Sequence, residues 1–231
     1  MSTFARLAFM ATLLVLWTAG MSSAAFVPIT GVQAGVNGHA PYMLESLTVG
    51  DFTITKESLA LGTSAGKAFL GSTIRYADDF DLNTVAARTA SGVWKVTKIG
   101  GQDTYRDTNG DAPDFFVFEA GMQDTLNVQA IMADGTLGKT VTISHDRWGY
   151  TGLERVGLYN LGQPIGGMAF AITDLLDAQG QSLASDAVIQ GLLFNSPNLD
   201  PVHFSAAMMT PEPATLAILG LGGFLALRRR P

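Results

Sequence analysis

The sequence contains no cysteine among its 231 residues. This absence excludes a disulfide framework, a zinc site with cysteine ligands and a cysteine nucleophile. The three histidines, His39, His145 and His203, stand far apart and lack the short spacings typical of metal-ligand pairs. The fold must therefore be held by its core, and a body of about 185 residues between two terminal segments is long enough to bury one.

Basic residues are also scarce. The chain has 14 Lys and Arg against 20 Asp and Glu, and four of the basic residues, Arg6 and Arg228 to Arg230, lie in the terminal segments. The body between them has ten basic and nineteen acidic residues, a net charge near −9. An acidic body repels nucleic acid and anionic lipid, which argues against both as partners and favours cations and neutral ligands such as glycans.

The first 25 residues have the pattern of a secretory signal peptide. Arg6 supplies a positive charge, Leu7–Trp17 is an uncharged run of eleven residues, and the small residues Ala24 and Ala25 suit cleavage by signal peptidase. The run is shorter than the roughly 20 residues that span a bilayer. We therefore expect an N-terminal signal helix that is removed during export; the alternative is a buried helix.

The other end combines two prolines, an apolar segment and a basic cluster. Residues 214–227 are fourteen uncharged residues, which as a helix span roughly 21 Å, less than the ~30 Å core of a bilayer. Terminal arginines favour the cytoplasmic side, and the prolines end the helix outside it. We expect a short hydrophobic helix held transiently in the inner membrane. The flanking residues are Pro211, Glu212, Pro213, Arg228, Arg229 and Arg230.

This tripartite tail, over residues 210–231, resembles the PEP-CTERM sorting signal. The resemblance implies processing by an exosortase, a membrane cysteine protease-transpeptidase, in bacteria that make extracellular polysaccharide and biofilm. It therefore implies an exported protein that reaches the cell surface or the extracellular matrix. A plain C-terminal membrane anchor is the alternative for this tail.

Between the two ends, short apolar or alternating runs are separated by turn-forming residues. Trp94–Ile99 has an apolar residue at every second position, which indicates a strand with one buried face. Phe115–Phe118 is continuously apolar, which indicates a strand covered on both faces. Turns are expected at Asp107–Asp111, Ala133–Gly135 and Gln179–Gly180.

About ten such strands predict an all-β domain, a β-sandwich or jelly roll, over residues 42–209. Residues 26–41 are expected to be a leader or linker, and one helix is expected at 174–179 or 184–187. The expected strands are Tyr42–Val49, Phe52–Thr55, Ser72–Tyr76, Val93–Ile99, Asp114–Glu119, Thr125–Met132, Lys139–Ser144, Gly167–Thr173, Val188–Phe194 and Val202–Met208.

Four stretches of the body resemble a group of PEP-CTERM surface proteins. They are Asp114–Gly121, Asp134–Gly138, Gly166–Leu175 and Ile189–Pro201. Such bodies look like galactose-binding-type jelly rolls, a fold used for glycan binding and adhesion, although a fold does not by itself define a function.

The acidic turn at 103–114 is a candidate site for structural Ca²⁺. Calcium takes six to eight oxygen ligands, and alternating Asp and Asn side chains in a turn can supply several of them. The EF-hand pattern is incomplete, and the alternative is a hairpin turn that uses Asn-Gly for its positive φ angles. The candidate ligands are Asp103, Asp107, Asn109, Asp111 and Asp114.

A second candidate is a glycan platform at 146–150. Trp148 and Tyr150 are two residues apart, so on an extended segment both rings face the same side and can stack on a sugar. Asp146 and Arg147 are placed to hydrogen-bond its hydroxyls. The alternative is that both rings belong to the core or a strand edge.

Catalytic patterns are weak. Gly62–Gly66 matches G-x-S-x-G, but a nucleophile elbow needs a strand before it and a helix after it, and no such alternation is evident. Carboxylate pairs such as Asp78 with Asp79, or Asp174 with Asp177, are the alternative for a glycoside hydrolase. The leading hypothesis is a noncatalytic surface protein associated with polysaccharide; the rivals are a carbohydrate-active enzyme and a purely structural coat protein.

Overall fold

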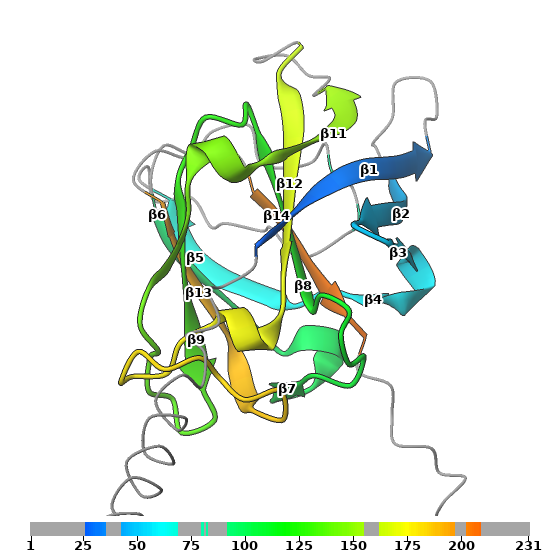
Figure 1. Cartoon of the computed structure of the whole chain (residues 1–231). Helices are drawn as coiled ribbons and strands as arrows, with labels where there is room; N and C mark the ends of the chain where they lie inside the picture. Colours follow the sequence, from blue (N-terminus) through cyan, green and yellow to red (C-terminus); the bar gives the residue numbers. More distant parts are fainter. Residues whose placement is uncertain are drawn as a thin grey trace, which may run out of the picture.

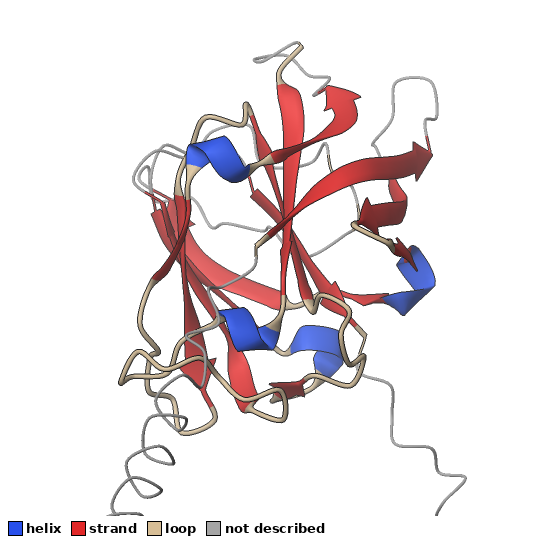
Figure 2. Cartoon of the chain, in the orientation of Figure 1, coloured by secondary structure: helices blue, strands red, loops and turns tan. Residues whose placement is uncertain are grey.

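A computed structural model describes residues 26–35, 43–68, 80, 82, 92–154, 162–196 and 202–208. Over these residues the chain is built of strands, joined by loops and four helices of one 3-10 turn each (Figure 2). The predicted all-β class is confirmed. The helices are η1 (Lys56–Ser58), η2 (Ile99–Gly101), η3 (His145–Arg147) and η4 (Ile172–Asp174).

The strands form two antiparallel sheets (Figure 1). The first has the order β3-β2-β1-β12-β8-β14-β4, with β11 also paired to β12; the second has the order β10-β9-β13-β6-β5, with β7 also paired to β13. The first contains β1 (Val27–Gly35), β2 (Met43–Val49), β3 (Phe52–Thr55), β4 (Leu59–Ala60), β8 (Phe115–Ala120), β11 (Gly149–Glu154), β12 (Pro164–Phe170) and β14 (Val202–Ala207). The second contains β5 (Thr63–Ala68), β6 (Gly92–Thr97), β7 (Tyr105–Arg106), β9 (Leu126–Met132), β10 (Val141–Ile143) and β13 (Val188–Ser196).

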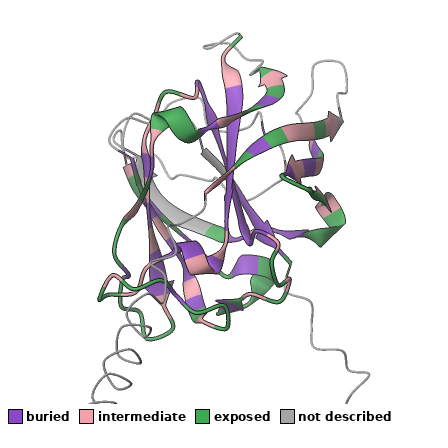
Figure 3. Cartoon of the chain, viewed as in Figure 1, coloured by how far each residue is buried: buried purple, intermediate pink, exposed green. Residues whose placement is uncertain are grey.

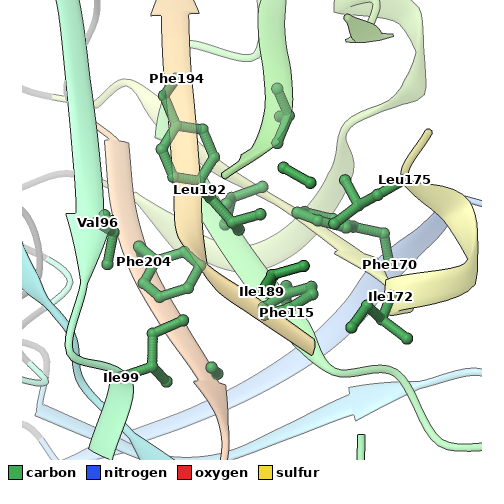
Figure 4. Packing of buried hydrophobic residues seen from close by; sticks show 14 of the residues in the cluster. Val96, Ile99, Phe115, Phe170, Ile172, Leu175, Ile189, Leu192, Phe194 and Phe204 are labelled. Atoms are coloured by element: carbon green, nitrogen blue, oxygen red, sulfur yellow. The ribbon is translucent and has the colours of Figure 1, made fainter. Parts of the chain in front are cut away.

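Aromatic rings fill the space between the two sheets (Figure 4). Phe194 of the second sheet packs edge-on against Phe204 of the first, with ring centroids 5.7 Å apart. Phe204 in turn stacks on Phe115, and Phe115 contacts Phe170. Each of these rings is at most 1% exposed, so the core is a sandwich core, as the sequence predicts.

Every residue of β8 is buried (Figure 3), so the face of β8 opposite the sandwich core is covered as well. Phe116 and Phe118 point away from the sandwich core and join a second cluster with Ile29, Leu44 and Leu47 of β1 and β2. Strand β1 pairs with β12 only through Val27 and Pro28 and then continues against β2. The β1–β2 end of the sheet thus covers the outer face of β8, and the prediction of a strand covered on both faces is confirmed.

The expected leader or linker over 26–41 is wrong for residues 27–35. Val27–Gly35 forms β1, and Ile29 is fully buried. The reason is that Ile29 and Val32, which lie on either side of the register shift between Ile29 and Gly31, pack in the second cluster. The expected helix at 174–179 or 184–187 is absent from these described residues, where η4 ends at Asp174 and the rest is turn or extended chain.

Several terminal and internal predictions fall outside the described residues. They are the signal helix at 1–25, the tail at 210–231 and the strand at Ser72–Tyr76. Among the described residues, none forms a helix with the length and apolarity needed to span a bilayer.

Strand β13 reaches the core on both sides of a bulge. Ile189 pairs with Met132 and Gly191 with Ile131, so two steps along β13 match one step along β9. In a regular strand, residues three apart such as Ile189 and Leu192 face opposite sides. The extra residue of the bulge brings both to the same face, where both are fully buried. At Gly191 the backbone of β6 lies so close that a Cβ atom would overlap the Val96 carbonyl oxygen.

We expect Gly191→Ala to lower the free energy of unfolding by roughly 1–3 kcal/mol, because either β6 or the bulge must shift to admit the methyl group. Urea unfolding of the purified protein measures this loss. Gly31→Ala is the matched control, since a Cβ there meets Thr48 at an ordinary 3.5 Å. Equal stability of the two variants would contradict this account of the bulge.

Candidate functional site

Asp114 joins three separate parts of the fold. Its Oδ1 accepts a hydrogen bond from the Tyr105 hydroxyl at 3.0 Å, and its Oδ2 accepts one from the Ile172 backbone N–H at 2.7 Å. Its own backbone N–H donates to the Phe170 carbonyl, and its carbonyl accepts from the Ala207 N–H. This fully buried residue thus ties β7, the β12–η4 junction and the end of β14 to the start of β8.

Burial raises the pKa of the Asp114 carboxyl to about 7, and the nearby negative charge of Asp107 adds to the rise. The bonds donated by Ile172 and Tyr105 act in the opposite direction. Burial and the Asp114 charge also raise the pKa of the Tyr105 hydroxyl. Tyr105 and Asp114 therefore form a structural link, in which the Asp114 carboxyl is protonated at a higher pH than an ordinary aspartate. The bond to Ile172 was not predicted from the sequence, because Ile172 lies 58 residues away.

The Asp107–Asp111 segment is the predicted turn. The Asp107 carboxylate accepts hydrogen bonds from the backbone N–H groups of Asn109, at 2.7 Å, and Gly110, at 3.2 Å. The Asn109 side-chain amide donates to the Pro113 carbonyl, and Gly110 has a φ of 72°. The turn is thus closed by its own side chains. It is not the hairpin of the alternative, because it connects β7 of the second sheet to β8 of the first, and Gly110 has a positive φ whereas Asn109 does not.

The five candidate calcium ligands are spread over this turn. Asp103 and Asp111 are exposed, whereas Asp114 is buried with both carboxylate oxygens bonded. Across the described part of the chain, no three His, Cys, Asp or Glu side chains are grouped so that they could hold one metal ion. Calcium binding by this loop remains a prediction.

The two-ring glycan platform is wrong. Trp148 is 5% exposed, its Nε1–H donates to the Asp124 carbonyl at 2.8 Å, and its ring belongs to the sandwich core. Tyr150 is 49% exposed. Trp148 precedes β11, which begins at Gly149, so the two-residue spacing that aligns side chains along a strand does not apply to it.

Three of the four predicted platform residues are nevertheless exposed. Asp146 and Arg147 lie on η3, directly before β11, and Tyr150 lies on β11 itself. A hydrogen bond from Ser144 lowers the pKa of Asp146 and thus favours the charged form of this carboxylate. We call these three exposed residues, which lie within five positions of one another in the chain, the Tyr150 surface; they comprise one aromatic ring, one carboxylate and one guanidinium.

Strand register places the Tyr150 surface at one end of the first sheet. Tyr150 is opposite Gly166, Gly166 is opposite Glu119, and Glu119 is opposite Val202, the first residue of β14. The row that contains Phe115 and Ala206 lies four residues further along β8, about 13 Å away. The last strand therefore leaves the sheet at the end remote from Tyr150.

The catalytic alternatives find no matching geometry among the described residues. Gly62–Gly66 runs into β5, and Ser64 lies inside that strand opposite Val96 instead of at a turn after a strand. Asp174 accepts from the Ala171 N–H and Asp177 from the N–H groups of Gln179 and Gln181, so both carboxylates close turns. His145 is exposed on η3, while Asp78, Asp79 and His39 lie outside the described residues.

Residues 210–230 match the family model described as the PEP-CTERM protein-sorting motif. The chain therefore carries this sorting motif, as its tail predicts, directly after the described end of the body at Met208. No curated protein and no solved structure matches the chain. The resemblance of the body to galactose-binding jelly rolls thus remains a prediction, while the sandwich arrangement of two sheets is observed.

Asp114 makes stability depend on pH. In the unfolded chain its carboxyl has the ordinary pKa of 3.8, and folding raises this to about 7. The stabilisation from the protonated group is complete below about pH 4 and is lost as the pH rises through 7, by up to about 4 kcal/mol for this shift. We expect Asp114→Asn to remove this part of the pH dependence, because the amide can accept from Ile172 and donate to Tyr105 without ionising.

Thermal unfolding between pH 4 and pH 8 measures the effect. The exposed Asp111→Asn is the control and should keep the slope of the unmodified protein. A slope that is unchanged in Asp114→Asn would show that this carboxyl does not titrate with folding.

Proposed function

We propose that the chain is an exported surface or matrix protein, processed at its tail by an exosortase, with a noncatalytic body that associates with extracellular polysaccharide. The sorting motif at 210–230 supports the first half of this proposal. Signal peptidase is the expected partner at the other end, at Ala24 or Ala25. The tail is expected to insert only transiently in the inner membrane.

The geometry of the body supports the second half. The sorting tail follows the Ala207 end of β14, and the Tyr150 surface lies toward the opposite end of the same sheet. A body held at its tail would therefore present Tyr150, Asp146 and Arg147 away from the point of attachment. An exposed ring flanked by hydrogen-bonding groups suits the apolar face and hydroxyls of a neutral sugar, and the net acidity of the body disfavours anionic surfaces.

Replacing both prolines of the sorting motif, Pro211→Ala with Pro213→Ala, should abolish tail processing, because an uninterrupted helix would no longer expose an extended stretch to the enzyme. Immunoblotting of the host's membrane and surface fractions would then show the protein retained at its longer form. The double variant Pro197→Ala with Pro201→Ala is the control and should be processed normally. Normal processing of the Pro211 and Pro213 variant would contradict the proposal.

Tyr150→Ala should weaken binding to the host's extracellular polysaccharide about threefold to tenfold, the loss expected for one stacking ring. Its melting temperature should hardly change, because the ring is half exposed. Phe52→Ala is the matched control, since Phe52 is 41% exposed and lies on β3, away from the Tyr150 surface. Affinity electrophoresis in gels that contain the polysaccharide measures all three proteins.

The outcomes separate the rival functions. Equal retardation of the Tyr150 and Phe52 variants would remove the Tyr150 surface as the binding site. Absence of retardation for the unmodified protein would favour the purely structural coat protein. Release of reducing sugar ends during the assay would favour the carbohydrate-active enzyme.

A further inference from the structure

The folded body holds the chain almost up to the sorting motif. The Ala207 N–H donates to the Asp114 carbonyl and the Met208 N–H donates to the Ser58 carbonyl, each at 2.7 Å. Only Met209 and Thr210 then precede Pro211. Three residue steps reach at most about 11 Å, so Pro211 stays within this distance of the last hydrogen bond of the body.

The last strand, β14, is not an edge strand of its sheet. Strand β14 lies between β8 and β4 and is hydrogen-bonded to both. Phe204, Ser205 and Ala206 are fully buried, and the Phe204 ring contacts Phe115 and Phe194 in the sandwich core. Withdrawing β14 to lengthen the tail would therefore open the core between the two sheets.

The tether is short compared with the size of the body. A compact domain of about 185 residues has a radius of gyration near 16 Å, whereas the tether is only about 11 Å long. An enzyme that binds an extended peptide by strand addition pairs with its main chain, so main chain that is already hydrogen-bonded within the body is not available to it. Here the free chain on the upstream side is two residues long.

We propose that docking of β14 and processing of the sorting motif compete, so that the folded body restricts the access of the processing enzyme to Pro-Glu-Pro. This inference rests on the proposed function, because it assumes that the tail is processed. The chain would be processed most readily before β14 docks, or whenever β14 is released. The completed fold then limits the supply of processed protein.

A spacer experiment on the full-length chain in its host tests this. Eight Gly and Ser residues are inserted between Met208 and Met209, and pulse-chase labelling follows the rate of tail loss. We expect a rate at least three times that of the unmodified chain. The control carries the same eight residues after Gly135, in the exposed turn between β9 and β10, and should keep the original rate because exposed turns tolerate insertions.

A second variant separates docking from tether length. Phe204→Ala loosens β14 without lengthening the tail, so it should also accelerate tail loss. When combined with the spacer it should add little, because both changes relieve the same restriction. Additive acceleration would mean that the two changes act independently and would contradict the competition.

The outcomes distinguish this inference from the proposed function. Equal rates for the unmodified chain and the Met208 spacer variant, with the tail still removed from both, would overturn the competition and leave processing intact. Retention of the tail in every variant would overturn both. Acceleration by the Met208 spacer and by Phe204→Ala, with the rate of the Gly135 insertion unchanged, is the result that supports the inference.

Discussion

The fold depends on the burial of β8 on every side. Phe115 and Val117 pack into the sandwich core, while Phe116 and Phe118 pack into the second cluster. Both edges of the strand are occupied, by β12 and β14. No residue of β8 is exposed to solvent, so a substitution in this strand would disturb the core. Asp114, directly before β8, is hydrogen-bonded to Phe170 at the end of β12 and to Ala207 at the end of β14. The positions of β12 and β14, and the place where the chain leaves the body after β14, are therefore set by β8 and Asp114.

That constraint gives the body two different ends. At the Asp114 end, β14 stops within two residues of the sorting motif. Toward the other end, β11 and η3 carry the exposed Tyr150, Asp146 and Arg147. A body attached through its tail would thus expose the end that carries Tyr150 and would leave little space around the end that carries Asp114. This arrangement connects the proposed polysaccharide contact with the restricted access proposed for the tail, since both are consequences of the direction in which β14 runs.

The sequence predicted the parts of the fold that have a strong hydrophobic pattern. The runs at β8, β9, β13 and β14 are apolar or alternating, and each was expected close to its observed bounds. Strands β5 and β11 were missed because Thr63–Ala68 and Gly149–Glu154 are rich in Gly, Ser, Thr and Ala, which indicate a turn as readily as an edge strand. Strand β1 was missed for the same reason. Trp148 was predicted on the wrong face because its orientation depends on where β11 begins. The hydrogen bond between Asp114 and Ile172 was missed because it joins residues that are distant in the sequence.

Intact mass measurement of the protein recovered from its host tests the central claim most directly. The account predicts a C-terminus beyond Ala207, so that β14 is complete, and before Arg228, so that the basic cluster has been removed. A mass that retains Arg228, Arg229 and Arg230 would contradict processing at the sorting motif. A C-terminus upstream of Ala207 would contradict the fold, because the body cannot keep its core without the whole of its last strand.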